Sequence, residues 1–293
     1  MSKTDLHIQE NLTTWLSPFF DDDTKKTIQQ LQASNPDELN DCFYKNLEFG
    51  TGGMRGVMGV GTNRINKYTL GKNTQGLSDY LHQTYPNQPI KVVIAFDCRH
   101  NSQSFAKIVA DVFSANNIEV FLFEDLRATP ELSFALKHLG CQCGIVLTAS
   151  HNPPEYNGYK VYWEDGGQLV PPFDGEIINL INSLEYTDIN FSANEELIHL
   201  IGKDVDDVFI NASVKNGSLE VNTPLSRENV SVVFTALHGT SITAVPETLK
   251  RAGYSNVHLV EAQSEPDGDF PTVKSPNPEE PEALKMALEL AEK

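Results

Sequence analysis

Three short apolar runs, separated by helix-like segments, constrain the fold of this chain more than any other feature. The runs cover residues 90–96, 118–123 and 143–147 and are rich in β-branched and aromatic residues, as expected of buried strands. Between them, apolar residues recur at helical spacing over residues 105–113, and a second helix is expected from an N-cap at Thr129 to Gly140. Strand–helix–strand units make right-handed crossovers, which bring the carboxyl ends of the strands to one edge of a sheet. The pattern therefore predicts an α/β fold, with the residues that follow each strand gathered at a single edge.

Residues 148–160 (TASHNPPEYNGYK) follow the third run and place a hydroxyl, an imidazole and an ammonium close together in the sequence, at Ser150, His151 and Lys160. Two adjacent prolines prevent a helix or strand from continuing, and the Asn-Gly pair at 157–158 is typical of a turn. The spacing predicts a tight functional loop that holds the three side chains near one another. The alternative is an ordinary surface Ser-His pair in a proline-rich turn.

The sequence TASHNP followed by YNGYK resembles the phosphoserine loop of the α-D-phosphohexomutases, the superfamily of phosphoglucomutases and phosphomannomutases. The resemblance implies that Ser150 carries a phosphoryl group, which it passes to a sugar phosphate and takes back through a bisphosphate intermediate. It implies that His151 and Lys160 supply acid–base and charge-stabilising groups. It also implies a Mg²⁺ ion on the phosphate of Ser150, with its remaining ligands expected beyond residue 293, and glucose 1,6-bisphosphate as an activator.

The chemistry of these side chains suits that assignment. Phosphoryl transfer needs in-line positioning and positive charge on the equatorial oxygens more than covalent help from the protein. A lysine supplies a point charge, and histidine is the side chain that ordinarily changes charge near neutral pH. No Gly-x-Ser-x-Gly sequence surrounds any serine of the chain, which argues against a hydrolase of that type.

Residues 50–61 (GTGGMRGVMGVG) form a glycine-rich segment around Arg55. Glycines let a backbone approach an anion, and a guanidinium among exposed amides can bind phosphate; the alternative is a hairpin or a linker. The spacing is neither a Walker sequence nor Gly-x-Gly-x-x-Gly, which counts against a nucleotide-dependent kinase or dehydrogenase. The segment resembles the N-terminal active-site loop of the same superfamily, which implies phosphate binding by Thr51, Gly52 and Arg55. It departs from that loop at residues 53–54, where Gly-Met replaces the usual Ala-Leu or similar pair.

Several other polar residues have two possible roles. Asp97 and Arg99 form either a local ion pair or a contact with substrate, whereas Arg64 is expected to be structural and His100 to be solvated. His238 belongs to a Leu-His-Gly-Thr sequence after an apolar run and resembles a superfamily motif at a strand end. Its role is left open between structural and functional.

Charge and cysteine content restrict the partners and the compartment. The net charge is −18, from 22 basic and 40 acidic residues, which argues against non-specific binding to nucleic acid or to anionic membranes. The N-terminus lacks the apolar core of a signal peptide, and no apolar stretch approaches the roughly 20 residues of a membrane helix. The four cysteines are not at zinc-binding spacing. We therefore predict reduced thiols in a cytoplasmic protein.

The chain divides into two predicted domains. Residues from about 8 to 47 are expected to form an amphipathic helical arm, and the sequence becomes polar and aperiodic near residue 200 before the strand–helix pattern resumes. The expected fold class is α/β: residues 1–200 form a mixed-sheet domain with the phosphoserine loop, and residues 201–293 form a second, similar and incomplete α/β domain. Residues 284–291 carry an apolar helical stripe, after which a crossover would normally enter another strand.

The resemblance implies that the whole protein interconverts hexose 1-phosphate and 6-phosphate. Glucose is the first choice, because the long glycine-rich loop resembles phosphoglucomutases of the larger, phosphopentomutase-related type. Phosphopentomutase or phosphomannomutase activity remains open, as do a non-catalytic sugar-phosphate-binding module and the oligomeric state. Because the resemblance covers only the N-terminal half of the superfamily architecture, we expect this chain alone to be inactive and its partners to be sugar phosphates.

Overall fold

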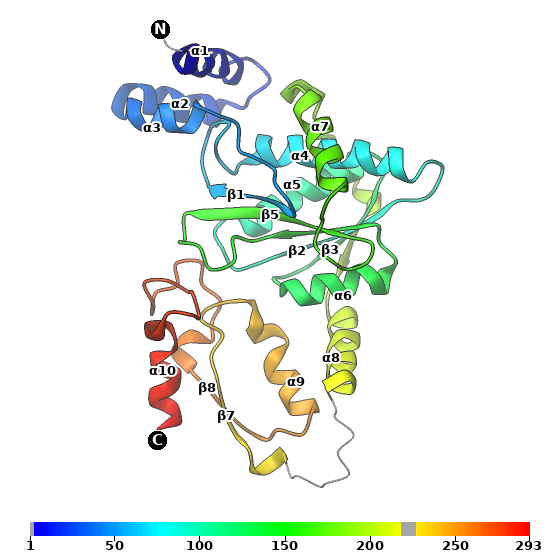
Figure 1. Ribbon diagram of the computed structural model, residues 1–293, viewed down its shortest axis with the longest axis vertical. Helices are drawn as coiled ribbons and strands as arrows, with labels where there is room; N and C mark the ends of the chain where they lie inside the picture. Colours follow the sequence, from blue (N-terminus) through cyan, green and yellow to red (C-terminus); the bar gives the residue numbers. More distant parts are fainter. Residues whose placement is uncertain (1–2, 218–226) are drawn as a thin grey trace.

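The computed structural model describes residues 3–217 and 227–293, which form a helical arm and two α/β units (Figure 1). The helices are α1 (Lys3–Trp15), α2 (Asp22–Ser34), α3 (Pro36–Phe43), α4 (Lys67–Thr84), α5 (Ser102–Ala115), α6 (Thr129–Leu139), α7 (Phe173–Ser183), α8 (Lys203–Gly217), α9 (Val245–Arg251) and α10 (Pro281–Ala291). The strands are β1 (Gly53–Val57), β2 (Lys91–Phe96), β3 (Glu119–Phe123), β4 (Cys143–Leu147), β5 (Tyr156–Trp163), β6 (Ile198–Ile201), β7 (Ser231–Phe234) and β8 (Asn256–Leu259).

The first unit is built on a six-stranded mixed sheet with the order β1-β5-β4-β2-β3-β6. Strands β4, β2, β3 and β6 are parallel, whereas β5 runs antiparallel to both β4 and β1. This confirms the predicted mixed-sheet α/β class. It also places Asp97, which follows β2, and Ser150, which follows β4, at the same edge of the sheet.

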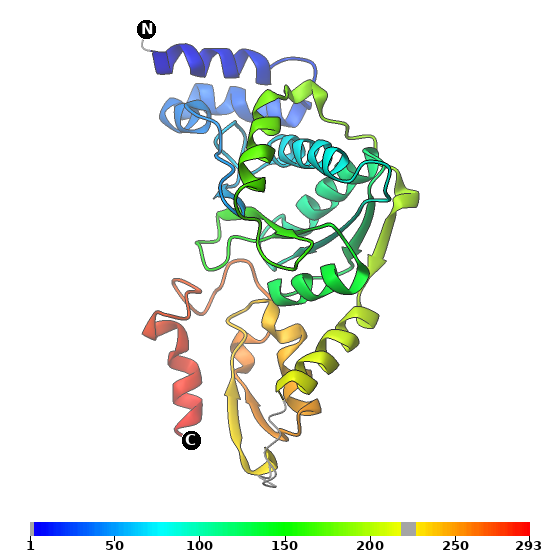
Figure 2. The ribbon, with the colours of Figure 1, turned by 45° about the vertical axis from the view of Figure 1, so that its right-hand side comes forward.

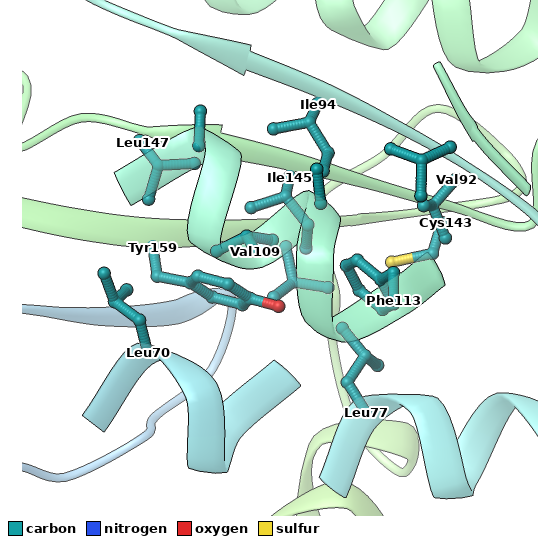
Figure 3. Packing of buried hydrophobic residues seen from close by; sticks show 14 of the residues in the cluster. Leu70, Leu77, Val92, Ile94, Val109, Phe113, Cys143, Ile145, Leu147 and Tyr159 are labelled. Atoms are coloured by element: carbon teal, nitrogen blue, oxygen red, sulfur yellow. The ribbon is translucent and has the colours of Figure 1, made fainter. Parts of the chain in front are cut away.

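Helices cover both faces of this sheet. Helices α4, α5 and α7 lie on one face and α6 on the other, with α8 leading from β6 to the second unit (Figures 1 and 2). The larger core lies beneath α4 and α5, where Ile94, Ile145 and Tyr159 pack against Val109 and Leu77 (Figure 3). Burial on two faces explains why β2 and β4 read as continuous apolar runs.

The arm consists of three helices, α1 to α3, held by an aromatic cluster. Trp15 is fully buried and stacks on Phe20 with ring centroids 4.6 Å apart. Its ring also meets Phe43 and Tyr68 edge-on, each at 5.5 Å. Edge-to-face and offset pairs of this kind stabilise a small core beyond the area that they bury. The predicted arm therefore has a core of its own, which includes Tyr68 of α4.

Two local predictions were wrong. Residues 157–158 are not a turn but lie in β5, opposite Gly56 and Arg55 of β1, because pairing with β1 and β4 overrides the local preference of Asn-Gly. The N-cap of α6 is Ala128 rather than Thr129, and it makes no side-chain cap. The end of that helix at Gly140 is confirmed, with the glycine in the left-handed conformation at φ 66°.

The second unit is smaller. Its sheet has two parallel strands, β7 and β8, with α8, α9 and α10 around them (Figure 2). Residue 200 lies within β6, the last strand of the first sheet, and the division into domains at that residue stays a prediction. None of the described helices combines the length and apolar character needed to span a membrane.

Candidate active site

Two cavities meet at the end of β4. The first, with a volume of about 570 Å³, lies between the glycine-rich segment and the residues after β4. The second, of about 380 Å³, lies between the two units and is bounded on the far side by residues 236–237 and 239–241. Thr148, Ser150 and Lys160 line both cavities. A group on Ser150 would therefore be accessible from either side.

Ser150 stands at the sharp turn that ends β4. Its backbone is left-handed, with φ 58°, a conformation that costs a non-glycine residue about 1 kcal/mol. The amide of Ser150 donates to Thr148 Oγ1 at 3.0 Å, which holds this turn. The residue is exposed, and its hydroxyl lies 3.5 Å from His151 Nδ1. The structure thus presents the hydroxyl and the imidazole of the predicted loop together.

Arg99 binds the backbone of this loop through its guanidinium. Its side chain is fully buried, and its guanidinium donates to the backbone carbonyls of four loop residues: Ser150 at 2.9 Å, Pro153 at 2.8 Å, Tyr156 at 3.1 Å and Asn152. Asp97 Oδ2 lies 3.5 Å from Arg99 Nε. The local ion pair is therefore real, but the larger role of Arg99 is to bind the loop's backbone.

Burial affects both members of this pair. Burial raises the pKa of Asp97, against hydrogen bonds from Thr148, from the Arg99 amide and from Ser102 that lower it. Burial likewise lowers the pKa of Arg99, against the charge of Asp97. The two groups therefore compensate each other's charge in a water-poor site.

Lys160 reaches the site from β5 rather than from the loop itself. It lies opposite Val146 of β4 and Gly53 of β1 and is partly buried. Burial lowers the pKa of its ammonium; the nearby Arg55 acts in the same direction, and Asp97 acts against both. An anion bound here would relieve the repulsion between the two cations.

Arg55 lies on β1, so part of the glycine-rich segment is an edge strand. The side chain is exposed, and Nη1 lies 3.4 Å from Asn152 Oδ1. Gly53 has φ 125°, and a Cβ there would lie 1.9 Å from the carbonyl oxygen of Tyr159. That glycine therefore permits close strand pairing, which the sequence reasoning had not assigned to it.

Thr51 and Gly52 line the first cavity, supported by two residues that sequence reasoning missed. Thr51 Oγ1 donates to Asp174 Oδ2 at 2.8 Å, and the Gly52 carbonyl accepts from Gln168 Nε2 at 3.2 Å. Asp174 lies in the first turn of α7, but nothing local in the sequence links it to Thr51. Gln168 itself lines the cavity.

The remaining candidates lie apart from the hydroxyl of Ser150. Arg64 is buried and paired with Asp41, which confirms its structural role. His100 is exposed, as predicted, but its Nε2 lies 2.7 Å from Asp269 Oδ1. His238 is 3% exposed, and its ring nitrogens contact other residues of the second unit, which favours the structural reading.

The Mg²⁺ ion that the resemblance implies would need oxygen ligands from the protein. Across residues 3–217 and 227–293, no group of three or more histidine, cysteine, aspartate or glutamate side chains is placed to hold a metal ion. Mg²⁺ prefers several oxygen ligands in octahedral geometry. The described residues therefore do not provide a complete Mg²⁺ site.

The four cysteines are free. Burial is the main cause that raises the pKa of Cys98 to about 11 and that of Cys141 to about 12. Thiols with raised pKa values are poor nucleophiles and poor metal ligands. The prediction of reduced thiols agrees with the four free cysteines.

Known families and individual proteins match most of this chain. The family model described as "Phosphoglucomutase/phosphomannomutase, alpha/beta/alpha domain I" matches residues 46–188, and the corresponding domain II model matches residues 207–293. The phosphoglucomutase of Staphylococcus haemolyticus is 39% identical over 85% of the chain and 45% of its own length. That of Staphylococcus aureus (strain N315) is 40% identical over 87% and 46%.

Solved structures share the fold. The crystal structure of a phosphoglucomutase/phosphomannomutase family protein from Burkholderia thailandensis matches with a TM-score of 0.62 at 23% identity, covering 82% of this chain and 48% of that chain. The chain thus spans somewhat less than half the length of the curated relatives given above.

Proposed function

The chain belongs to the phosphoglucomutase/phosphomannomutase family, and from that premise we propose that Ser150 carries a phosphoryl group that is exchanged with a sugar phosphate. Membership confirms the resemblance read from residues 148–160. Among the sugars, a glucose phosphate is the proposed substrate, since the curated relatives reported above are named phosphoglucomutases.

One observation carries the proposal: the exposed hydroxyl of Ser150 stands where two cavities meet, with a partly buried ammonium on the wall of both. A phosphoryl group there would lie within the field of Lys160, and Arg55 lines the first cavity. Positive charge fixed in advance around the transferring group is what lowers the barrier to phosphoryl transfer. Thr51 and Gly52 are proposed to bind phosphate in the same cavity.

In the proposed step, a sugar hydroxyl oxygen attacks the phosphorus of phosphorylated Ser150 and the bond from phosphorus to the serine oxygen breaks. The proton that the sugar hydroxyl loses passes to the serine oxygen, which leaves as a neutral hydroxyl. His151, which lies beside the serine oxygen, is proposed to move protons, and Lys160 to stabilise the charge on the phosphoryl oxygens. The reverse transfer, from the other phosphate of the sugar bisphosphate, restores phosphorylated Ser150. Mg²⁺ is proposed to bind the serine phosphate, with ligands outside the described residues.

Turnover is proposed for the natural protein that contains these 293 residues. Because the chain spans less than half the length of the relatives reported above, we propose that residues 1–293 alone turn over little sugar phosphate. The cytoplasm is the proposed compartment.

The experiment incubates the natural protein with Mg²⁺ and glucose 1,6-bisphosphate and locates added phosphate by peptide mass spectrometry. We expect phosphate on the peptide that contains Ser150. Ser150→Ala should abolish it, whereas Ser104→Ala, an exposed serine on α5, should leave it unchanged.

Lys160→Met tests the electrostatic part of the proposal. It should slow phosphorylation about 100-fold or more, since it removes a preorganised charge from the site. Lys137→Met, on α6 outside both cavities, is the matched control. Phosphate that persists in Ser150→Ala would overturn the proposal, and saturable binding of glucose phosphate without any phosphoserine would favour a non-catalytic binding module.

A further inference from the structure

We infer that the second unit positions the Ser150 loop, by covering the buried guanidinium of Arg99 with Phe270. Phe270 belongs to the segment between β8 and α10, which reaches up to the first unit in both views (Figures 1 and 2). The catalytic consequence of this contact rests on the role proposed for Ser150. The contact itself, and its effect on the loop, do not.

The ring of Phe270 packs on the guanidinium of Arg99. The Cζ atom of Arg99 lies 5.2 Å from the centroid of the Phe270 ring, within the range of a cation–π interaction. Phe270 is 5% exposed, so its ring keeps water from one face of the guanidinium. A hydrogen bond is stronger where water is excluded. The four bonds from Arg99 to the loop's carbonyls therefore gain strength from a residue of the other unit.

The backbone that precedes Phe270 also packs closely against the first unit. A Cβ at Gly268 would lie 2.9 Å from the carbonyl oxygen of Cys98 and 3.0 Å from the amide nitrogen of His100, so the two backbones meet where a side chain would not fit. Next to it, Asp269 contacts the imidazole of His100 at 2.7 Å. The segment 267–270 is thus seated directly on the turn that carries Arg99.

Hydrogen bonds attach this segment to the second unit. The Asp267 amide donates to the carbonyl of His238 at 3.0 Å. The His238 ring lies 2.9 Å from Thr272 Oγ1 through Nε2 and 3.1 Å from the Glu265 carbonyl through Nδ1. His238 therefore fixes both ends of the turn that presents Phe270, which gives the buried histidine of the Leu-His-Gly-Thr sequence a definite task.

These contacts form one path from the end of β7 to the loop after β4. Phe270 adopts a left-handed backbone, with φ 50°, and such a conformation persists only where its surroundings hold it. If the second unit moved away from the first, the ring would leave Arg99 and water would reach the guanidinium. Alignment of the Ser150 loop is therefore linked to docking of the second unit, and Phe270 is a positioning residue.

The test is hydrogen–deuterium exchange of residues 148–156, measured by mass spectrometry on the natural protein. Phe270→Ala should speed exchange in this loop about tenfold, because the loop opens more readily, while peptides of β2 keep their protection. Phe270→Tyr keeps the ring and should restore the loop's protection. Phe209→Ala is the matched control, since its ring packs on Phe134 of α6, at a different contact between the units.

Two outcomes would overturn the inference. In the first, Phe270→Ala leaves the exchange rates of both residues 148–156 and the β2 peptides unchanged. In the second, Phe209→Ala speeds exchange of residues 148–156 as much as Phe270→Ala does. If Phe270→Ala does not fold, Phe270→Leu removes the aromatic face with a smaller loss of volume and is judged by the same comparison. The rate of Ser150 phosphorylation is followed in parallel. Absence of phosphoserine in the unaltered protein would count against the proposed function alone, because the exchange measurement does not require transfer.

Discussion

The two α/β units repeat the same order of apolar strand and helix, yet they bury their strands to different degrees. In the first unit, every residue of β4 and all but the first residue of β2 are buried. In the second, no residue of β7 or β8 is buried, and the strands alternate at best between exposed and partly buried positions. The difference does not follow from strand composition, since Val-Val-Phe in β7 is as apolar as Val-Val-Ile in β2.

The neighbouring strands and helices explain this difference in burial. Strand β2 lies between β3 and β4 and has helices on both faces, whereas β7 pairs with β8 alone among the strands in the described residues. Apolar burial stabilises a strand in proportion to the area removed from water. The first unit is therefore expected to be stable through its core, and the second to depend more on polar contacts such as those of His238.

Truncation of one leucine in each unit gives the largest expected contrast. Leu147 of β4 is fully buried, so Leu147→Ala should lower the free energy of unfolding by about 2–5 kcal/mol. Leu259 of β8 is partly buried, so Leu259→Ala should cost about 1 kcal/mol, because less apolar area is lost. Urea unfolding followed by the fluorescence of Trp15 in the arm and Trp163 in β5 reports on the first unit with its arm. Hydrogen exchange of the β7 and β8 peptides reports on the second unit. Equal losses of free energy in the two variants would contradict the expected difference between the units.

A pH-dependent effect is expected where α6 of the first unit meets α8. Glu131 is fully buried; burial and the neighbouring carboxylate of Asp206 raise its pKa to about 8, and Arg127 acts in the opposite direction. Between the ordinary value of 4.5 and about 8, the folded protein keeps a proton that the unfolded chain has released. The free energy of unfolding should therefore fall as pH rises through this window, and change no further above it.

Urea unfolding at about pH 5 and pH 8 measures this effect. We expect Glu131 to lower the free energy of unfolding by about 1–3 kcal/mol between pH 5 and pH 8. Glu131→Gln should remove this contribution to the pH dependence. Glu124→Gln, an exposed carboxyl in the loop after β3, is the control and should retain it. An unaltered slope in Glu131→Gln would show that this carboxyl is already ionised in the folded protein.

The smallest expected effect is that of His238→Ala. Loss of the contacts to Thr272 and Glu265 should lower the free energy of unfolding of the second unit by about 1 kcal/mol and speed hydrogen exchange in residues 263–272. His258→Ala, an exposed histidine of β8, should change neither. If His238→Ala left residues 263–272 fully protected, polar contacts would not be what holds this unit.

Much of the fold could be predicted because it depends on local chemistry. The apolar runs identified β2, β3 and β4, although they missed the edge strand β6. Gly140 ended α6 in the left-handed conformation that glycine allows, and Ser150 lies at the turn after β4 as expected. Each of these features is decided by residues within a few positions of one another. Lys160 was assigned to the same loop, but it comes from β5, since strand pairing overrode the turn preference of Asn-Gly at 157–158.

The sequence alone thus determined the family, the strands β2, β3 and β4 with the helices between them, and the serine that follows β4. Only the tertiary structure decided what holds that serine in place: Arg99 reaches carbonyls more than fifty positions away, and Phe270 reaches Arg99 from the other unit. Asp174 and Gln168 support the glycine-rich segment from more than a hundred positions away. Such contacts leave no periodicity or spacing in the sequence, because they depend on which surfaces meet after the sheet has formed.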